Sequence, residues 1–144
     1  MIGLIALAAA TLSAPERTAV YIAAGAKRRG SGWAICTDDA NAVARIDSVS
    51  DLNGDGRPEA VVSEDGSYCN GGAETGFALV SKQANGKWRL MVSMSGMPEF
   101  MNTKGAGGWP DISVGGPGFC FPVLRWNGRN YVNQRREYDG KPCR

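Results

Sequence analysis

Two stretches of the chain share one pattern of residue types. Gly56–Val62 and Gly108–Val114 each contain a glycine, a proline, an acidic residue and then a mostly apolar run. A cysteine follows each stretch, and after it an Asn-Gly pair separates two apolar runs, which indicates a β-hairpin. A pattern that recurs in this way predicts a duplicated β unit. Two copies cannot close a propeller, which needs about four blades or more, so we expect a compact sheet or a small sandwich.

The remaining local signals indicate short strands and one helix. Ser13, followed three residues later by Glu16, predicts a helix start, and Gly25 is a natural end. With 20 Gly and 7 Pro among 144 residues, the composition favours turns over long helices. We predict an α+β fold, mainly antiparallel β, with an N-terminal helix and two degenerate blade-like repeats in a single domain, 15–144. The repeats span about 43–96 and 103–138, and the strands are expected at 43–49, 60–63, 77–82, 88–93, 112–114, 122–126 and 129–132.

Residues 1–14 resemble the apolar part of a signal peptide. Ile2–Leu12 is almost entirely Ile, Leu, Ala and Gly and is too short to span a bilayer. No basic residue precedes it, and Pro15 disfavours cleavage after Ala14. We expect an export signal here, the alternative being an apolar N-terminal arm. Nothing in the sequence predicts stable membrane insertion.

Four cysteines without a C-x-x-C pair predict two disulfides. Three pairings are possible, and we favour Cys36–Cys69 with Cys120–Cys143, because each closes a local loop and the second secures the C-terminus. The alternative is four buried free thiols in a cytosolic protein. Together with the apolar leader, the cysteines indicate a periplasmic or secreted protein.

Composition excludes several chemistries. The chain has no histidine, which removes Ser-His and Cys-His catalysis and the commonest metal ligand. The net charge of +2 gives no electrostatic case for nucleic acid. The basic run Lys27-Arg28-Arg29 is interpreted as a solvated turn.

The segment from Asp51 to Glu59 has the pattern of a calcium loop. Oxygens at alternate positions converge on one point when the backbone curls, and Gly54 and Gly56 permit the necessary torsions. Calcium suits this set better than magnesium, and the alternative is an ion-free turn. The second copy has no carboxylate at the matching positions 103–107, so we predict one Ca²⁺ per chain. The predicted ligands are the side chains of Asp51, Asn53, Asp55 and Glu59 and the carbonyl of Arg57.

This nine-residue motif, D-x-N-x-D-G-x-x-E, resembles the calcium loops of FG-GAP and VCBS-type repeats, where the loop connects strands. It is not an EF-hand, because position twelve is Val62 and a strand is predicted there. The resemblance covers Val49 to about Gly96 and, more loosely, Gly107–Tyr131. The resemblance to FG-GAP and VCBS-type repeats implies a metal-stabilised β module outside the cytoplasm that serves adhesion or recognition. A longer pattern, Asp51–Val62 followed by Gly107–Pro122, resembles small exported bacterial proteins and implies no activity.

Two glycine-rich stretches carry the aromatic residues Trp109 and Phe119, with Asp111 between them. If exposed, these residues could bind a sugar or a peptide; alternatively, Trp109 is a core residue. Our leading hypothesis is a non-catalytic module that binds a protein or a cell-envelope glycan. A second hypothesis is an inhibitor of a secreted hydrolase, with the loop Gly115–Phe121 as its wedge.

The main rival to the leading hypothesis is a glycan hydrolase, because paired carboxylates need no histidine. Their spacing in the sequence cannot show which two would face each other. The candidate carboxylates outside the loop are Asp38, Asp39, Glu64, Asp65, Glu74, Glu99 and Asp111.

Overall fold

The structure is a computed structural model that describes residues 12–144, so the predicted signal segment lies almost entirely outside the described residues. The helical elements are α2 (Ala14–Ala23), α3 (Ser67–Asn70), and the 3-10 turns η1 (Gly71–Ala73) and η2 (Ala106–Gly108). The strands are β1 (Lys27–Arg29), β2 (Gly32–Ala34), β3 (Ala44–Ser50), β4 (Glu59–Asp65), β5 (Thr75–Lys82), β6 (Trp88–Ser95), β7 (Met97–Lys104), β8 (Pro110–Gly115), β9 (Phe121–Trp126), β10 (Tyr131–Tyr138) and β11 (Lys141–Pro142).

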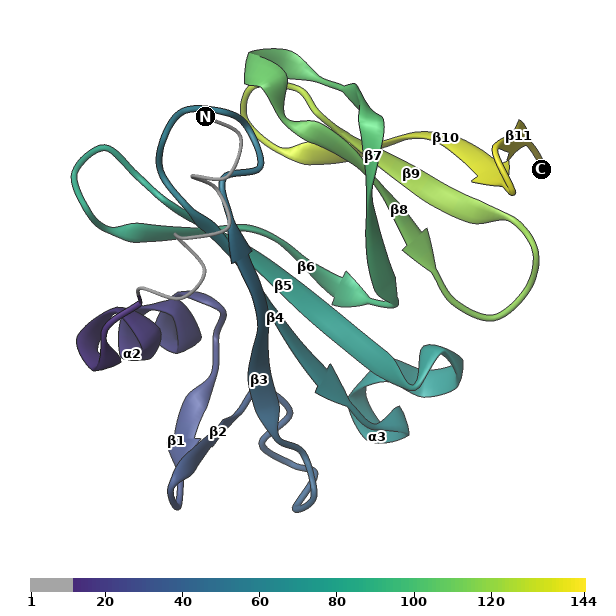
Figure 1. The fold of residues 1–144 in the computed structure, drawn as a ribbon. Helices are drawn as coiled ribbons and strands as arrows, with labels where there is room; N and C mark the ends of the chain where they lie inside the picture. The colour runs from purple at the N-terminus through teal and green to yellow at the C-terminus, as the bar shows by residue number, and fades with distance from the viewer. Residues whose placement is uncertain (1–11) are drawn as a thin grey trace.

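The strands pair antiparallel in three sheets (Figure 1). β1 and β2 form a small hairpin, β3 to β6 form a four-stranded sheet, and β7 to β11 form a five-stranded sheet. In both larger sheets each strand pairs with the next one along the chain. The two copies of the Gly-x-Pro-acidic pattern lead into β4 and β8, the second strand of each sheet. The predicted α+β fold, mainly antiparallel β with an N-terminal helix, is confirmed.

Two apolar clusters hold the layers together. Val61 and Leu79 of the four-stranded sheet pack against Ile112 and Leu124 of the five-stranded sheet. On the opposite face of the four-stranded sheet, α2 contributes Val20 to a second cluster. The result is a small sandwich with a helix on one outer side, which Figure 1 shows at the lower left.

The α2 helix begins at its predicted cap. The Ser13 hydroxyl accepts a hydrogen bond from the Glu16 backbone N–H at 3.2 Å, and Gly25, with a φ of 90°, follows the helix end. The Glu16 carboxylate does not fold back onto the cap. It pairs with the Lys82 ammonium and accepts a hydrogen bond from Trp88 Nε1 at 2.8 Å, and thereby fastens the helix to the four-stranded sheet.

Both Asn-Gly pairs lie in hairpin turns, but neither forms the predicted two-residue turn, because neither Asn85 nor Asn127 has a positive φ. The Asn127 N–H donates to the Asn130 carbonyl at 3.0 Å, and this pair encloses Gly128 and Arg129. Gly128 has a positive φ of 99° and Asn127 does not, whereas the expected turn needs two positive torsions. The Asn127 side chain instead accepts two backbone N–H groups of the turn.

Four strands were not predicted: β1, β2, β7 and β11. β7 contains Pro98, which an edge strand tolerates. The polar residues of β7 obscure the alternation of apolar and polar side chains that usually indicates a strand. The second meander therefore begins at Met97, earlier than the predicted start near 103. The run Lys27–Arg29, interpreted as a turn, forms β1.

The favoured disulfide pairing is confirmed. Cys36 pairs with Cys69 and Cys120 with Cys143, at Cα–Cα distances of 6.1 and 5.7 Å. None of the four cysteines is free, which is typical of a protein from an oxidising compartment. Among the helices within 12–144, none has the length and apolar character to cross a membrane.

Replacing Cys120 and Cys143 together by serine should lower the free energy of unfolding by about 3 kcal/mol, because the unfolded chain gains freedom over a 23-residue separation. Urea denaturation measures this change. Amide exchange should rise in β10 and β11 and stay low in β4 and β5. An unchanged unfolding free energy would contradict a structural role for this bridge.

Candidate metal centre

The segment between β3 and β4 closes around the carboxylate of Asp51. Its two oxygens accept the backbone N–H groups of Gly54 at 2.9 Å and Gly56 at 2.8 Å. Both glycines have positive φ values, 77° and 85°, which the sharp curl requires. Asn53 Oδ1 accepts the N–H of Asp55 at 3.3 Å. Asp51, Asn53 and Asp55, three of the four predicted side-chain ligands, thus accept hydrogen bonds from the loop's own backbone N–H groups, and Asp55 is exposed.

Glu59 starts β4 and is buried, with 1% of its surface exposed. Its Oε1 accepts the N–H of Leu52 at 2.7 Å and its Oε2 accepts the hydroxyl of Ser81 at 2.8 Å. Within the described residues no basic side chain pairs with it. Burial raises the pKa of Glu59 to about 7. The nearby carboxylates of Asp55 and Asp51 also raise this pKa, whereas the two hydrogen bonds lower it.

The predicted ligands are not all gathered as carboxylates at one point. Over residues 12–144 no three His, Cys, Asp or Glu side chains are grouped so that they could hold a metal ion. Both Glu59 oxygens are engaged by Leu52 and Ser81, and the Arg57 guanidinium pairs with Asp55 at 3.0 Å. A cation here would depend on amide, carbonyl and water oxygens as well as on carboxylates. That mixture is ordinary for calcium, whose ninth loop position often binds through water.

The second repeat also has an acidic residue at the matching position, Asp111, and this residue forms ion pairs with basic side chains. Asp111 of β8 is fully buried, and Arg125 grips it with two hydrogen bonds of 3.0 and 2.9 Å. Arg135 at 3.1 Å and the Thr103 hydroxyl at 2.5 Å complete the set. Burial alone would raise the pKa of Asp111, but these hydrogen bonds outweigh it and lower the pKa to about 2. Sequence reasoning missed both arginines, because they lie on β9 and β10.

The register explains the difference between the copies. Glu59 pairs across the strands with Ser81, whereas Asp111 lies next to the Ile112–Leu124 pair, opposite Arg125. A serine therefore stands in the first copy where the second copy has an arginine. Among residues 12–144 the buried carboxylate of the first copy has no positive partner, and it is this copy that carries the acidic loop.

The loop also touches its counterpart in the other sheet. Gly108 of η2 lies so close to the Asn53 carbonyl that an added Cβ would be 3.1 Å from it. The next residue, Trp109, packs against Trp126 and Tyr131 in the core between the sheets, at ring-centroid distances of 5.7 and 6.4 Å. The loop therefore lies against the start of β8 at the junction of the two sheets.

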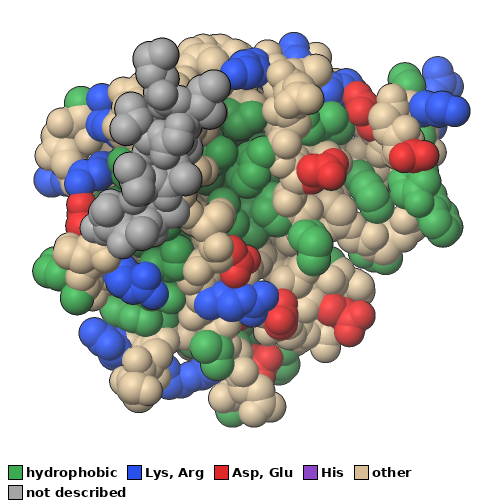
Figure 2. Space-filling model, viewed as in Figure 1, with side chains coloured by type: hydrophobic (Ala, Val, Ile, Leu, Met, Phe, Trp, Pro, Cys, Tyr) green, Lys and Arg blue, Asp and Glu red, His purple; other side chains and the backbone are tan. Residues whose placement is uncertain are grey.

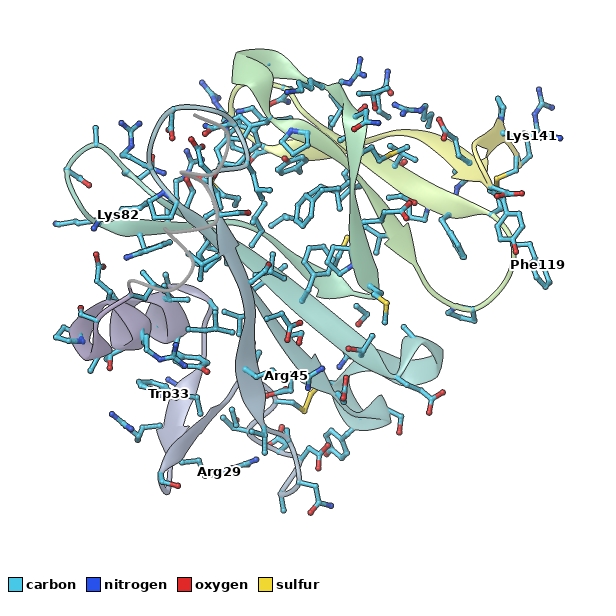
Figure 3. All side chains as sticks on the ribbon, viewed as in Figure 1. Arg29, Trp33, Arg45, Lys82, Phe119 and Lys141 are labelled. Atoms are coloured by element: carbon cyan, nitrogen blue, oxygen red, sulfur yellow. A yellow bond between two sulfur atoms is a disulfide. The ribbon has the colours of Figure 1, made fainter. Side chains whose placement is uncertain are left out.

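The three residues predicted to bind a ligand do not share one surface. Trp109 and Asp111 are buried, with 7% and 0% of their surfaces exposed. Phe119 is 76% exposed and contacts Tyr138 edge to face at 5.4 Å; Figure 3 shows it at the right-hand margin, in the loop between β8 and β9. Tyr138 was not singled out from the sequence, since only the fold brings β10 beside this loop.

The candidate carboxylates for hydrolysis are scattered. Glu64 is 4% exposed, and its carboxylate accepts hydrogen bonds from the backbone N–H groups of Ile35 and Cys36 at 2.7 and 2.8 Å. These bonds give Glu64 a structural role. Glu99 lines a groove of about 550 Å³ that also contains Glu137 and the ring of Tyr138. Glu137 was not among the candidates from the sequence.

Comparisons of the chain with protein-family models, with curated proteins and with solved structures gave no match. Function is therefore inferred from the geometry of the site.

Changing Asp111 to Asn should destabilise the protein at neutral pH by about 3 kcal/mol, because two arginines lose their buried partner. A lowered pKa stabilises the fold above the ordinary value of 3.8, and that contribution, about 2 kcal/mol, is lost as the pH falls toward 2. The variant should lack this acid-dependent loss. Urea unfolding as a function of pH measures it, with exposed Asp139→Asn as control; parallel profiles for wild type and Asp111→Asn would contradict the arrangement.

Glu59 should give the opposite pH dependence when divalent cations are removed. Because its pKa is raised from 4.5 to about 7, stability is complete below 4.5 and falls by about 3 kcal/mol as the pH rises through 7. Glu59→Gln should abolish this fall. Unfolding in chelator at about pH 5 and pH 8 tests it, and an equal loss in the variant would show that another group is responsible.

Proposed function

We propose that the chain is an exported, non-catalytic recognition module in which one Ca²⁺, bound at the Asp51–Glu59 loop, stabilises the junction of the two repeats. The observation that carries this proposal is the buried Glu59 carboxylate, which has no basic partner among the described residues. Its equivalent, Asp111, has two. A calcium ion would supply in the first copy the positive charge that arginines supply in the second.

The donor set supports calcium through its chemistry. Asp51, Asn53 and Asp55 offer hard oxygens at alternate positions, and the curl of the loop already exists in their hydrogen bonds to backbone N–H groups. Asp51 shapes the loop, and Glu59 contributes negative charge from the sheet. The expected affinity is that of extracellular modules, about 10⁻⁴ to 10⁻³ M.

The β8–β9 loop supports a role in recognition. Phe119 exposes most of its ring, and the neighbouring Cys120 is anchored to Cys143. An exposed aromatic on a covalently anchored loop loses little freedom on binding, and aromatics are enriched where proteins contact partners. We propose that this loop contacts a protein or a cell-envelope glycan. An inhibitor of a secreted hydrolase would use the same loop.

A glycan hydrolase ranks second. The groove with Glu99 and Glu137 supplies two carboxylates beside an aromatic ring, as such chemistry needs. Glu59, whose raised pKa would suit a general acid, does not line this groove.

Thermal unfolding of the full oxidised chain tests the calcium proposal. At pH 7.5, about 5 mM calcium should raise Tm by roughly 4–8 °C over chelator, because binding at this affinity stabilises the folded state by about 1–2 kcal/mol. Magnesium should have a smaller effect. Asp51→Asn should remove the calcium-dependent increase, and Asp38→Asn, an exposed carboxylate outside the loop, should retain it. Equal Tm values in calcium and in chelator would overturn the proposal.

A further inference from the structure

A pocket far from the calcium loop lies between α2 and the β1–β2 hairpin. Its volume is about 320 Å³, and its lining includes Arg17, Thr18, Arg28, Ser31 and Trp33. None of the described lining residues is acidic. Basic side chains are visible over α2 and this hairpin at the lower left of Figure 2, and Figure 3 shows Trp33 between the two elements.

Stacking fixes the position of Arg28 in this pocket. Arg28 and Trp33 are direct cross-strand partners in the hairpin, so both side chains lie on one face. The guanidinium carbon is 4.6 Å from the centroid of the Trp33 ring. Trp33 in turn stacks on Tyr21 of α2, with centroids 5.1 Å apart and planes at 10°. Tyr21 is buried and accepts a hydrogen bond from the Ile46 N–H at 3.2 Å, so the stack rests on the core.

The hydrogen-bond donors of Arg28 are not used by the fold. A guanidinium that stacks through its face keeps its N–H groups free at the edge. Within the described part of the chain, neither Arg28 nor Arg17 has an ion pair or a side-chain hydrogen bond. Their neighbour Arg29 differs, since it donates to the carbonyls of Thr37 and Ala42. Stacking therefore holds the Arg28 side chain in place, and its N–H groups have no partner among the described residues.

We propose that this pocket binds an oxyanion, the carboxylate or phosphate group of a small ligand or of a polymer chain. The edge of the Arg28 guanidinium matches the two oxygens of such a group, and Arg17 adds a second positive charge. The hydroxyls of Thr18 and Ser31 are further donors in the lining. The pocket shares no residue with the calcium loop, so a failure of the calcium proposal would leave this proposal unaffected, and the reverse also holds.

An NMR titration of the full oxidised chain tests this site. The probes are inorganic phosphate, glucuronate, and glucose as the uncharged analogue of glucuronate. Phosphate or glucuronate should cause saturable shifts at Arg28 Nε–H and at the amides of Ser31 and Trp33, and glucose should not. The tighter of the two anions assigns the ligand's class. Failure of both to saturate below about 20 mM, or shifts located elsewhere, would overturn the proposal.

Two matched variants separate a built site from general attraction between charges. Arg28→Lys keeps the charge but loses the planar fork, and should weaken binding by about fivefold or more. Arg89→Lys is the control, because the Arg89 guanidinium also lies over a tryptophan, 5.5 Å from the Trp126 centroid, and is outside the pocket. Unchanged melting curves would show that both variants fold. Equal affinities for the two variants would contradict the assignment.

Discussion

A buried carboxylate at the start of the second strand is the constraint that both repeats have to satisfy. Removing a charged group from water without a counter-charge is expensive. In the second repeat, Arg125 and Arg135 meet this need for Asp111 through side-chain ion pairs. In the first repeat, the partner strand offers only the hydroxyl of Ser81 to Glu59. We propose that the acidic loop beside Glu59 binds a cation from solution, which would supply the first copy with the positive charge that arginines supply in the second.

The acidic loop also contacts the other sheet, next to the core that the two sheets share. Asn53 lies against Gly108, and the neighbouring Trp109 enters the core between the sheets. The helix side is fastened separately, through the Glu16 contacts with the four-stranded sheet. The two features proposed to bind a partner lie at the surface: the Phe119 loop, anchored by a disulfide, and the Arg28 pocket.

Much of the fold could be predicted because its signals are local. The Ser13 cap, the turn positions of both Asn-Gly pairs and most strands follow from short-range preferences, and the disulfide pairing follows from loop closure. What failed depends on tertiary context. β7 looks irregular because an edge strand can carry Pro98, and the basic run Lys27–Arg29 gains its strand from pairing with β2. The burial of Asp111 needs arginines from two other strands, which no local pattern can reveal.

The direct test of the central claim is a calorimetric titration of the chelator-treated, oxidised chain with calcium near neutral pH. One calcium ion bound per chain is the predicted result, because the second repeat already contains its cations and has no acidic loop. Asp55→Asn should lose that binding, while the equivalent change at Asp139 should not. Absence of binding at about 5 mM calcium, or two ions per chain, would contradict the idea that Glu59 and Asp111 are neutralised in these two different ways.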